Sequence, residues 1–187
     1  MADIELLLEE TQERMDAAVE AMKRGFGAVR TGKASPALVE GLMVDYYGAR
    51  TRLRDIASIT TPEPRLLVIQ PWDQNAVKDI EKAIQASSLG ISPVSDGRVI
   101  RLPIPELSEE RRQDLSRLVH KQAEEARIEV RNVRREANEA CKKAQKATEI
   151  TEDDLTVMTK DIQELTDSYI EQINELMQGK DAELMQV

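Results

Sequence analysis

The sequence predicts an α+β protein in which an elongated three-helix bundle carries a small inserted β/α/β domain. Three long segments repeat apolar residues at alternating spacings of four and three, the pattern of helices that pack in a bundle. Between the first and the second of them, residues 31–105 hold most of the prolines and glycines, which indicates short elements and turns. We therefore expect the bundle to comprise residues 1–30 and 106–187, and the inserted domain residues 31–105.

The first predicted helix covers residues 4–29. Its apolar stripe runs from Ile4 through Met15 to Val29. The inserted domain then contains apolar, β-branched or aromatic runs of strand length. These runs predict three strands, at 42–47, 65–70 and 98–102. Between the last two, Asp73 can cap a short helix that ends near Leu89 and Gly90.

Two further long helices complete the predicted bundle. Ser108 is suited to cap a helix over 108–147, whose apolar stripe starts at Val119. At about 1.5 Å per residue this helix would be roughly 60 Å long. Thr151 with Asp154 resembles a capping box, and the stripe from Leu155 to Leu176 gives the last helix.

Two connections join the predicted domains, at about 30–33 and 102–106. Glycine and proline in these connections favour a limited hinge between the domains. The residues that we expect to form it are Arg30, Thr31, Gly32, Pro103 and Pro105.

Composition argues against several classes of protein. The single cysteine, Cys141, cannot form an internal disulfide, which fits a reducing, cytoplasmic location. With His120 as the only histidine, no His-Cys metal cluster can be assembled. No apolar run is long enough to cross a membrane. Phosphate-binding glycine loops and nucleophile motifs are absent, so we expect no enzyme, no metal and no cofactor.

Four side chains that could suggest chemistry have structural interpretations. We expect Trp72 to be a partly buried anchor where a strand meets a helix. Tyr46 and Tyr47 are adjacent in a predicted strand and should point to opposite faces. Cys141 should be a partly buried, inert thiol.

The charge of the chain is unevenly distributed. A formal net charge of −9 argues against general nucleic-acid binding. Residues 101–146, however, contain twelve Lys or Arg and nine Asp or Glu, a net of +3, which leaves −12 for the other residues. On a helical wheel the basic residues gather on one flank of the stripe, namely His120, Arg127, Arg131 and Arg134. Acidic residues gather on the opposite flank, namely Glu125, Glu129 and Glu136.

Two interpretations of the basic flank remain open. It can be a solvated surface with weak ion pairs. It can also be a phosphate-binding surface, because arginine grips phosphate bidentately. In the second case the acidic remainder would repel other nucleic acids and leave only a shaped site able to accept the flank.

Several long blocks resemble the signature segments of ribosome recycling factors, and the similarity runs essentially from end to end. They are RTGKASPALVEGLMVDYYG at 30–48, IEKAIQASSLGISP at 80–93, IRLPIPELSEERRQDL at 100–115, ARIEVRNVRREAN at 126–138 and the ending DAELMQ. The resemblance implies an L-shaped monomer of two domains, with the dimensions of a transfer RNA. It also implies binding to large-subunit ribosomal RNA on the post-termination 70S ribosome. With elongation factor G, which hydrolyses GTP, such a factor separates the subunits and needs no cofactor of its own.

The resemblance further implies which residues contact RNA. The family's ribosome-contacting arginines lie in the EERR and RNVRR blocks, which here carry Arg112, Arg131 and Arg134, with Arg127 a neighbouring candidate. We expect contacts to phosphates rather than to bases. Lys33 stands where many relatives have arginine.

The alternative function is a helical scaffold or chaperone whose bundle binds a partner helix without RNA.

Overall fold

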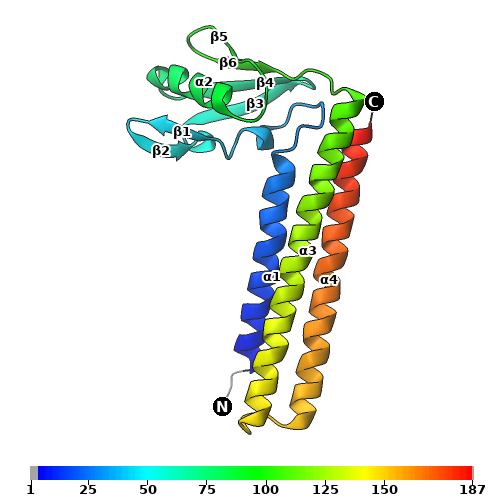
Figure 1. The fold of residues 1–187 in the computed structure, drawn as a ribbon. Coiled ribbons are helices and arrows are strands. Elements are labelled where there is room, and N and C mark those ends of the chain that lie inside the picture. The colour runs from blue at the N-terminus through cyan, green and yellow to red at the C-terminus, as the bar shows by residue number, and fades with distance from the viewer. Residues whose placement is uncertain (1–3, 187) are drawn as a thin grey trace. The chain divides into compact units, whose positions relative to one another are not determined.

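The computed structural model describes residues 4–186, and the chain divides into two compact units. One unit comprises the chain up to Phe26 and Ser116–Glu183, and the other comprises Gly27–Leu115 and the last residues from Leu184. Long helices and small antiparallel sheets are both present, as Figure 1 shows, so the predicted α+β class is confirmed.

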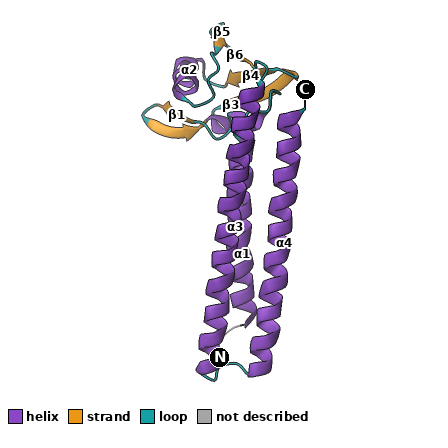
Figure 2. Cartoon of the chain, turned by 45° about the vertical axis from the view of Figure 1, so that its right-hand side comes forward, coloured by secondary structure: helices purple, strands orange, loops and turns teal. Residues whose placement is uncertain are grey.

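Three long helices run side by side in the first unit, and two views of the chain agree on this (Figures 1 and 2). They are α1 (Ile4–Gly27), α3 (Glu109–Lys146) and α4 (Glu152–Met185). The 38 residues of α3 make it about 57 Å long at 1.5 Å per residue. All three helices lie where the apolar stripes predict them.

Both caps predicted for helices of the bundle are present. Ser108 Oγ accepts a hydrogen bond from the backbone N–H of Arg111 at 3.2 Å. Thr151 and Asp154 form a reciprocal capping box, in which each side chain accepts from the backbone N–H of the other, at 2.9 and 3.1 Å. These caps fix where α3 and α4 begin.

The buried stripe of α1 differs from the predicted one by one residue in places. Alternating spacings of four and three from Ile4 would bury Ala18 and Gly25, but these are only half-buried, and Val19 and Phe26 are buried instead. A straight helix has 3.6 residues per turn, so its buried face drifts away from a strict 3.5-residue repeat. The side chain of Ile4 lies outside the described residues.

The buried stripe of α3 follows the prediction as far as Ala137. Beyond it, alternating spacings of four and three would bury Ala140 next. Cys141 takes this position instead, and its side chain is fully buried. The thiol is therefore more enclosed than expected, and burial raises its pKa. It packs in a cluster with Ala137, Ile150, Met158 and Ile162.

The second unit contains two sheets and one α-helix. Four antiparallel strands have the order β3-β4-β6-β5, and a separate hairpin is formed by β1 and β2. The bounds are β1 Met43–Tyr46, β2 Ala49–Arg52, β3 Ala57–Glu63, β4 Leu66–Pro71, β5 Val94–Ser95, β6 Ile100–Pro103 and α2 Val77–Ala86. Figure 2 shows the strands in orange.

Buried and exposed side chains alternate along the central strands, and the buried ones form the core of this unit. Leu67 and Ile69 on β4 are fully buried, as is Leu102 on β6, while Gln70 and Arg101 are exposed. The helix α2 packs against the same core through its apolar face.

The three predicted strands correspond to β1, β4 and β6. The strands β2, β3 and β5 were not predicted. One of them, β2, is the sequence ARTR, in which only Thr51 is partly covered and the other three side chains are exposed. A strand with so little buried surface has no apolar pattern by which it could be recognised.

Two predictions about aromatic residues are wrong. Trp72 is 70% exposed and is not a buried anchor. Tyr46 and Tyr47 do not point to opposite faces, because Tyr47 lies at the hairpin turn with a φ of 49° and its side chain folds back. The two rings contact edge to face at 4.5 Å, and both hydroxyls donate to Asp73 Oδ2.

Candidate nucleic-acid interface

Three of the four arginines predicted to contact RNA lie together on one flank of α3. Arg127, Arg131 and Arg134 are separated by four and three residues, which places them above one another on the helix. Their hydrogen bonds reach residues of α4, so this basic flank borders α4. His120 continues the flank toward the start of α3.

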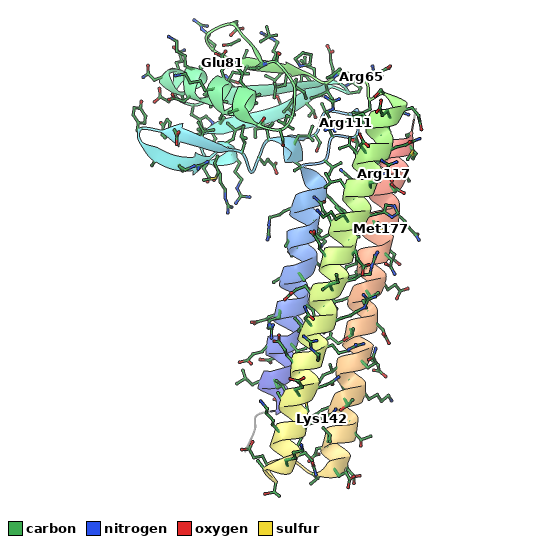
Figure 3. All side chains as sticks on the ribbon, viewed as in Figure 1. Arg65, Glu81, Arg111, Arg117, Lys142 and Met177 are labelled. Carbon is green, nitrogen blue, oxygen red and sulfur yellow. The ribbon has the colours of Figure 1, made fainter. Side chains whose placement is uncertain are left out.

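Arg127 is the most enclosed member of the flank, since its side chain is only 15% exposed. Its Nε donates to Glu124 at 3.0 Å and its Nη1 donates to Asn174 Oδ1 at 3.0 Å. Its guanidinium also lies against the sulfur of Met177, which is labelled in Figure 3. These contacts hold α3 against α4, so part of the role of Arg127 is structural.

Arg131 is more exposed than Arg127, whereas Arg134 is half-buried. Arg131 is 46% exposed and its Nη1 lies 3.4 Å from Glu124 Oε1. Arg134 Nη1 contacts Gln163 Oε1 at 3.5 Å, the outer limit of a hydrogen bond. Neither contact uses all five donors of an arginine, so both side chains retain donors for another acceptor.

Glu124 is the anion at the centre of the flank. One oxygen contacts Arg127 and the other contacts Arg131. The hydrogen bond from Arg127 and the positive charge of both guanidinium groups lower the pKa of Glu124. The carboxylate therefore stays ionised at neutral pH and offsets part of the positive charge. The helical wheel did not single out Glu124, although its spacing of three and seven from the two arginines is visible in the sequence.

At the upper part of the flank a small network joins α3 to α4. Asp181 accepts from Ser116 Oγ at 2.5 Å, and its other oxygen lies 3.1 Å from His120 Nε2. Burial acts to raise the pKa of Asp181, but the hydrogen bonds from Ser116 and His120 outweigh it, and the pKa is lowered. His120 is thus an exposed residue whose ring contacts a carboxylate of the neighbouring helix.

Arg112 does not lie on the basic flank. It precedes Val119 by seven residues and so falls on the extension of the buried stripe. Its side chain is half-buried, and its Nε is buried without a hydrogen-bond partner among the described residues. The structure therefore separates Arg112 from the other three arginines.

The opposite flank of α3 is acidic and borders α1. Glu136 pairs with Arg14 Nη1 at 2.6 Å, and this hydrogen bond is the main reason that the pKa of Glu136 is lowered. A shallow groove of about 330 Å³ lies between α1 and α3 on this side. Its lining residues are Ala18, Ala21, Met22, Gly25, Gln122, Glu125, Ala126 and Glu129. The predicted separation of charges around α3 is therefore present, with the basic residues beside α4 and the acidic ones beside α1.

The residues predicted as a hinge lie in segments that are partly fixed to the sheets. Gly32 adopts a φ of +84°, which favours glycine, and Arg30 is half-buried with a pKa lowered by burial and by Arg111. Pro103 is the last residue of β6, and the next residue, Ile104, donates to Arg65 O at 2.8 Å. Hinge motion itself stays a prediction.

Among the described residues, neither a metal-binding cluster of side chains nor a membrane-spanning helix is found. Between residues 4 and 186, no three His, Cys, Asp or Glu side chains are grouped so that they could hold a metal ion. Within the same range, every helix is too short or too polar to cross a bilayer.

Comparison with known proteins identifies the family. The profile of the family described as Ribosome recycling factor matches residues 22–185 of this chain. The chain belongs to the ribosome recycling factor family. The ribosome-recycling factors of Halalkalibacterium halodurans and Bacillus pumilus are each 52% identical to it over 181 residues, which cover 97% of this chain and 98% of the relative.

Solved structures of ribosome recycling factors support the same assignment. A solution structure of the ribosome recycling factor is 44% identical, covers 100% of both chains and has a TM-score of 0.79. A second structure is 43% identical, covers 98% of this chain and 99% of the other, and has a TM-score of 0.69. It is described as models for the T. thermophilus ribosome recycling factor and the E. coli elongation factor G bound to the E. coli post-termination complex.

Ribosome recycling factors are non-enzymatic translation factors, so this family member is not an enzyme. The basic flank is thus a candidate binding surface and not a catalytic site. Sequence reasoning found its arginines but missed their partners on α4, Gln163 and Asn174, because no local spacing links two helices that meet only in the folded bundle.

Proposed function

We propose that this chain binds the post-termination 70S ribosome and, with elongation factor G and GTP, promotes its dissociation into subunits. The observation that carries the proposal is the match over 98% of the chain to the T. thermophilus factor, which is described with elongation factor G on the post-termination complex. The GTP is used by elongation factor G, and this chain needs no cofactor. Such a role belongs in the cytoplasm.

Binding through large-subunit ribosomal RNA is supported by the chemistry of the basic flank. Arg131 is exposed and Arg134 is half-buried, and both retain unused donors. Arginine suits phosphate because its donors form a planar fork. We assign these two the main phosphate contacts. The side chain of Arg127 is less exposed, and its ion pair with Glu124 holds part of the flank in place. We assign Arg112 a separate RNA contact, because it lies on the extension of the buried stripe of α3 and not beside the other three arginines.

We also keep the predicted domain organisation as part of the proposal. The bundle comprises residues 1–30 and 106–187, and the inserted domain comprises residues 31–105. A hinge between them at about 30–33 and 102–106 is supported by the glycine conformation at Gly32. On the second connection, the hydrogen bond of Ile104 to the sheet leaves Pro105 as the first residue beyond the ladder.

The recycling role is tested by sucrose-gradient sedimentation of post-termination ribosomes. We expect conversion to subunits only when this protein, elongation factor G and GTP are all present. Reactions that omit each component in turn serve as controls. Intact 70S ribosomes in the complete reaction, with the protein left at the top of the gradient, would contradict the proposal and favour the scaffold alternative.

The assignment of the flank is tested by charge reversal at Arg131 and Arg134. We expect the double variant R131E/R134E to lose ribosome binding while its helical circular dichroism is unchanged, because neither side chain is part of the buried core. The matched control is K142E/K143E, which changes the net charge equally at two exposed positions near the end of α3 (Figure 3). Equal loss in both variants would mean that net charge matters rather than the flank.

Salt dependence separates the two candidate functions independently. Each phosphate contact lowers the logarithm of the affinity by about 0.7 to 0.9 per tenfold increase in salt. Several contacts therefore predict a steep decline in ribosome binding. A scaffold that binds a partner helix through apolar residues would show a flat response.

A further inference from the structure

The β1–β2 hairpin presents a row of arginines on its outward face. The strands pair so that Val44 lies opposite Thr51, and Val44 is fully buried. Because side chains alternate along a strand, the neighbouring pairs face outward. These are Arg52 opposite Met43 and Arg50 opposite Asp45.

The turn of the hairpin fixes this register. Tyr47 and Gly48 both have positive φ, at 49° and 79°. Two such residues form the type of two-residue turn whose twist matches the strands on either side. A one-residue slip would bring Arg50 and Arg52 to the buried face, so the arginines are held outward by the packing of Val44.

The guanidinium groups of Arg50 and Arg52 have no polar partner in the part of the chain that the structure describes. Several exposed arginines in this acidic chain pair with a carboxylate, as Arg14, Arg65 and Arg101 do. The side chains of Arg50 and Arg52 are exposed and form neither an ion pair nor a hydrogen bond within residues 4–186. Asp45 lies opposite Arg50 in the ladder but does not pair with it.

A third arginine extends the row beyond the strand. Arg54 is exposed in the short helical turn Leu53–Asp55, and its Nε lies 3.8 Å from Asp55 Oδ1. Residues 43–55 contain three arginines and two aspartates, a net of +1, so the rest of the chain carries −10. The hairpin is thus a local positive surface on an acidic protein.

We propose that the outward face of the β1–β2 hairpin binds the phosphate backbone of RNA through Arg50 and Arg52, with Arg54 beside them. Residues two apart on a strand are separated by about 7 Å, which lets adjacent guanidinium groups contact successive charges of one nucleic-acid strand. Arginine is also better suited than lysine to the shape of a phosphate. The inference rests on the proposed binding to ribosomes and adds a second contact, separate from the flank of α3.

The first test measures ribosome affinity as a function of salt for the full chain and R50Q/R52Q. Loss of two phosphate contacts should reduce the slope of log affinity against log salt by about 1.5. The matched control is K78Q/K82Q, which removes two exposed charges from α2 in the same unit and should leave the slope unchanged. An unchanged slope in R50Q/R52Q, or an equal change in both variants, would overturn the proposal.

The second test locates RNA beside the hairpin. A cysteine in place of Met43, which is 38% exposed opposite Arg52, can carry an iron chelate that generates hydroxyl radicals. The native Cys141 is fully buried and stays unlabelled. We expect M43C to cleave ribosomal RNA, and A86C at the end of α2 to cleave it less. A weakened R50Q/R52Q without cleavage from M43C would indicate an acidic protein as the partner and would overturn the assignment to RNA.

The same assays distinguish failure of the inference from failure of the proposed function. If the unaltered chain does not bind ribosomes, the proposed function fails and the hairpin contact fails with it. If the unaltered chain binds, R131E/R134E releases it and R50Q/R52Q has no effect, only the hairpin contact is wrong.

Discussion

Tyr169 links α4 to α1 and should make the stability of the bundle depend on pH in the alkaline range. Its ring is 6% exposed, and its hydroxyl donates to Asp16 Oδ1 at 2.7 Å. Burial and the neighbouring carboxylate of Asp16 raise the pKa of Tyr169 from its ordinary value of 10 to about 12. The protonated hydroxyl is thus favoured in the folded state.

The sign and size of the effect follow from proton linkage. Below pH 10 both states keep the proton, and the stabilisation from Tyr169 is fully present. Between pH 10 and about 12 the unfolded chain loses its proton first, so the free energy of unfolding falls by about 1.4 kcal/mol per pH unit. Across this whole pH range the loss amounts to about 2.7 kcal/mol.

The variant Y169F isolates this effect because it removes the titrating hydroxyl and keeps the ring. At pH 8 it should be less stable by about 1 kcal/mol, the usual net value of one hydrogen bond whose acceptor stays in water. At pH 12 the order should reverse, because only the unaltered chain has lost stability through Tyr169. Urea unfolding followed by circular dichroism at both pH values measures the difference. A difference between the two proteins that is the same at pH 8 and pH 12 would refute the reasoning.

Three further predictions concern stability. Truncating the fully buried Ile162 to alanine should cost about 2 to 5 kcal/mol, seen as a lower urea midpoint, and a cost below 1 kcal/mol would mean that the bundle core is loosely packed. Gly25→Ala should raise the melting temperature, since alanine favours a helix by about 1 kcal/mol and only the flexible end of Gln122 must move; a lower value would show that Gln122 is fixed. Asp96→Asn should destabilise the second unit at pH 7 but not below pH 2. Backbone N–H groups lower the pKa of Asp96 from its ordinary value of 3.8 to about 2, so the stabilisation from this carboxylate is lost as the pH falls through this range. Equal melting of the two proteins at pH 7 would contradict this.

The bundle could be predicted because the apolar residues that each helix buries recur at regular spacings along the sequence. A stripe such as that from Val119 to Val133 recurs over several turns, and no competing local signal interrupts it. The hairpin strand β2 could not be predicted, because its stability comes from pairing with β1 rather than from its own buried side chains. The exposure of Trp72 was missed for a related reason, since an aromatic residue is usually buried and only the folded domain shows otherwise.

The candidate site likewise has one part that could be predicted from the sequence and one part that could not. The flank of Arg127, Arg131 and Arg134 follows from spacing along a single helix. The enclosure of Arg127 depends on Asn174 and Met177, which approach from α4 and have no fixed offset in the chain. Residue type and register thus predict which groups share a surface, whereas their exposure depends on the neighbouring helix.

If the flank binds RNA as proposed, the carboxylate of Glu124 shortens the time for which that RNA stays bound. On the proposed flank a phosphate that approaches Arg131 meets a guanidinium already shared with a fixed internal anion, not one surrounded only by water. Binding is then an exchange of one anion for another, and the internal carboxylate remains beside the site to take the guanidinium back. Such exchange lowers residence time more than it lowers the rate of encounter. A factor that must leave each ribosome before serving the next gains from an acid placed at this position.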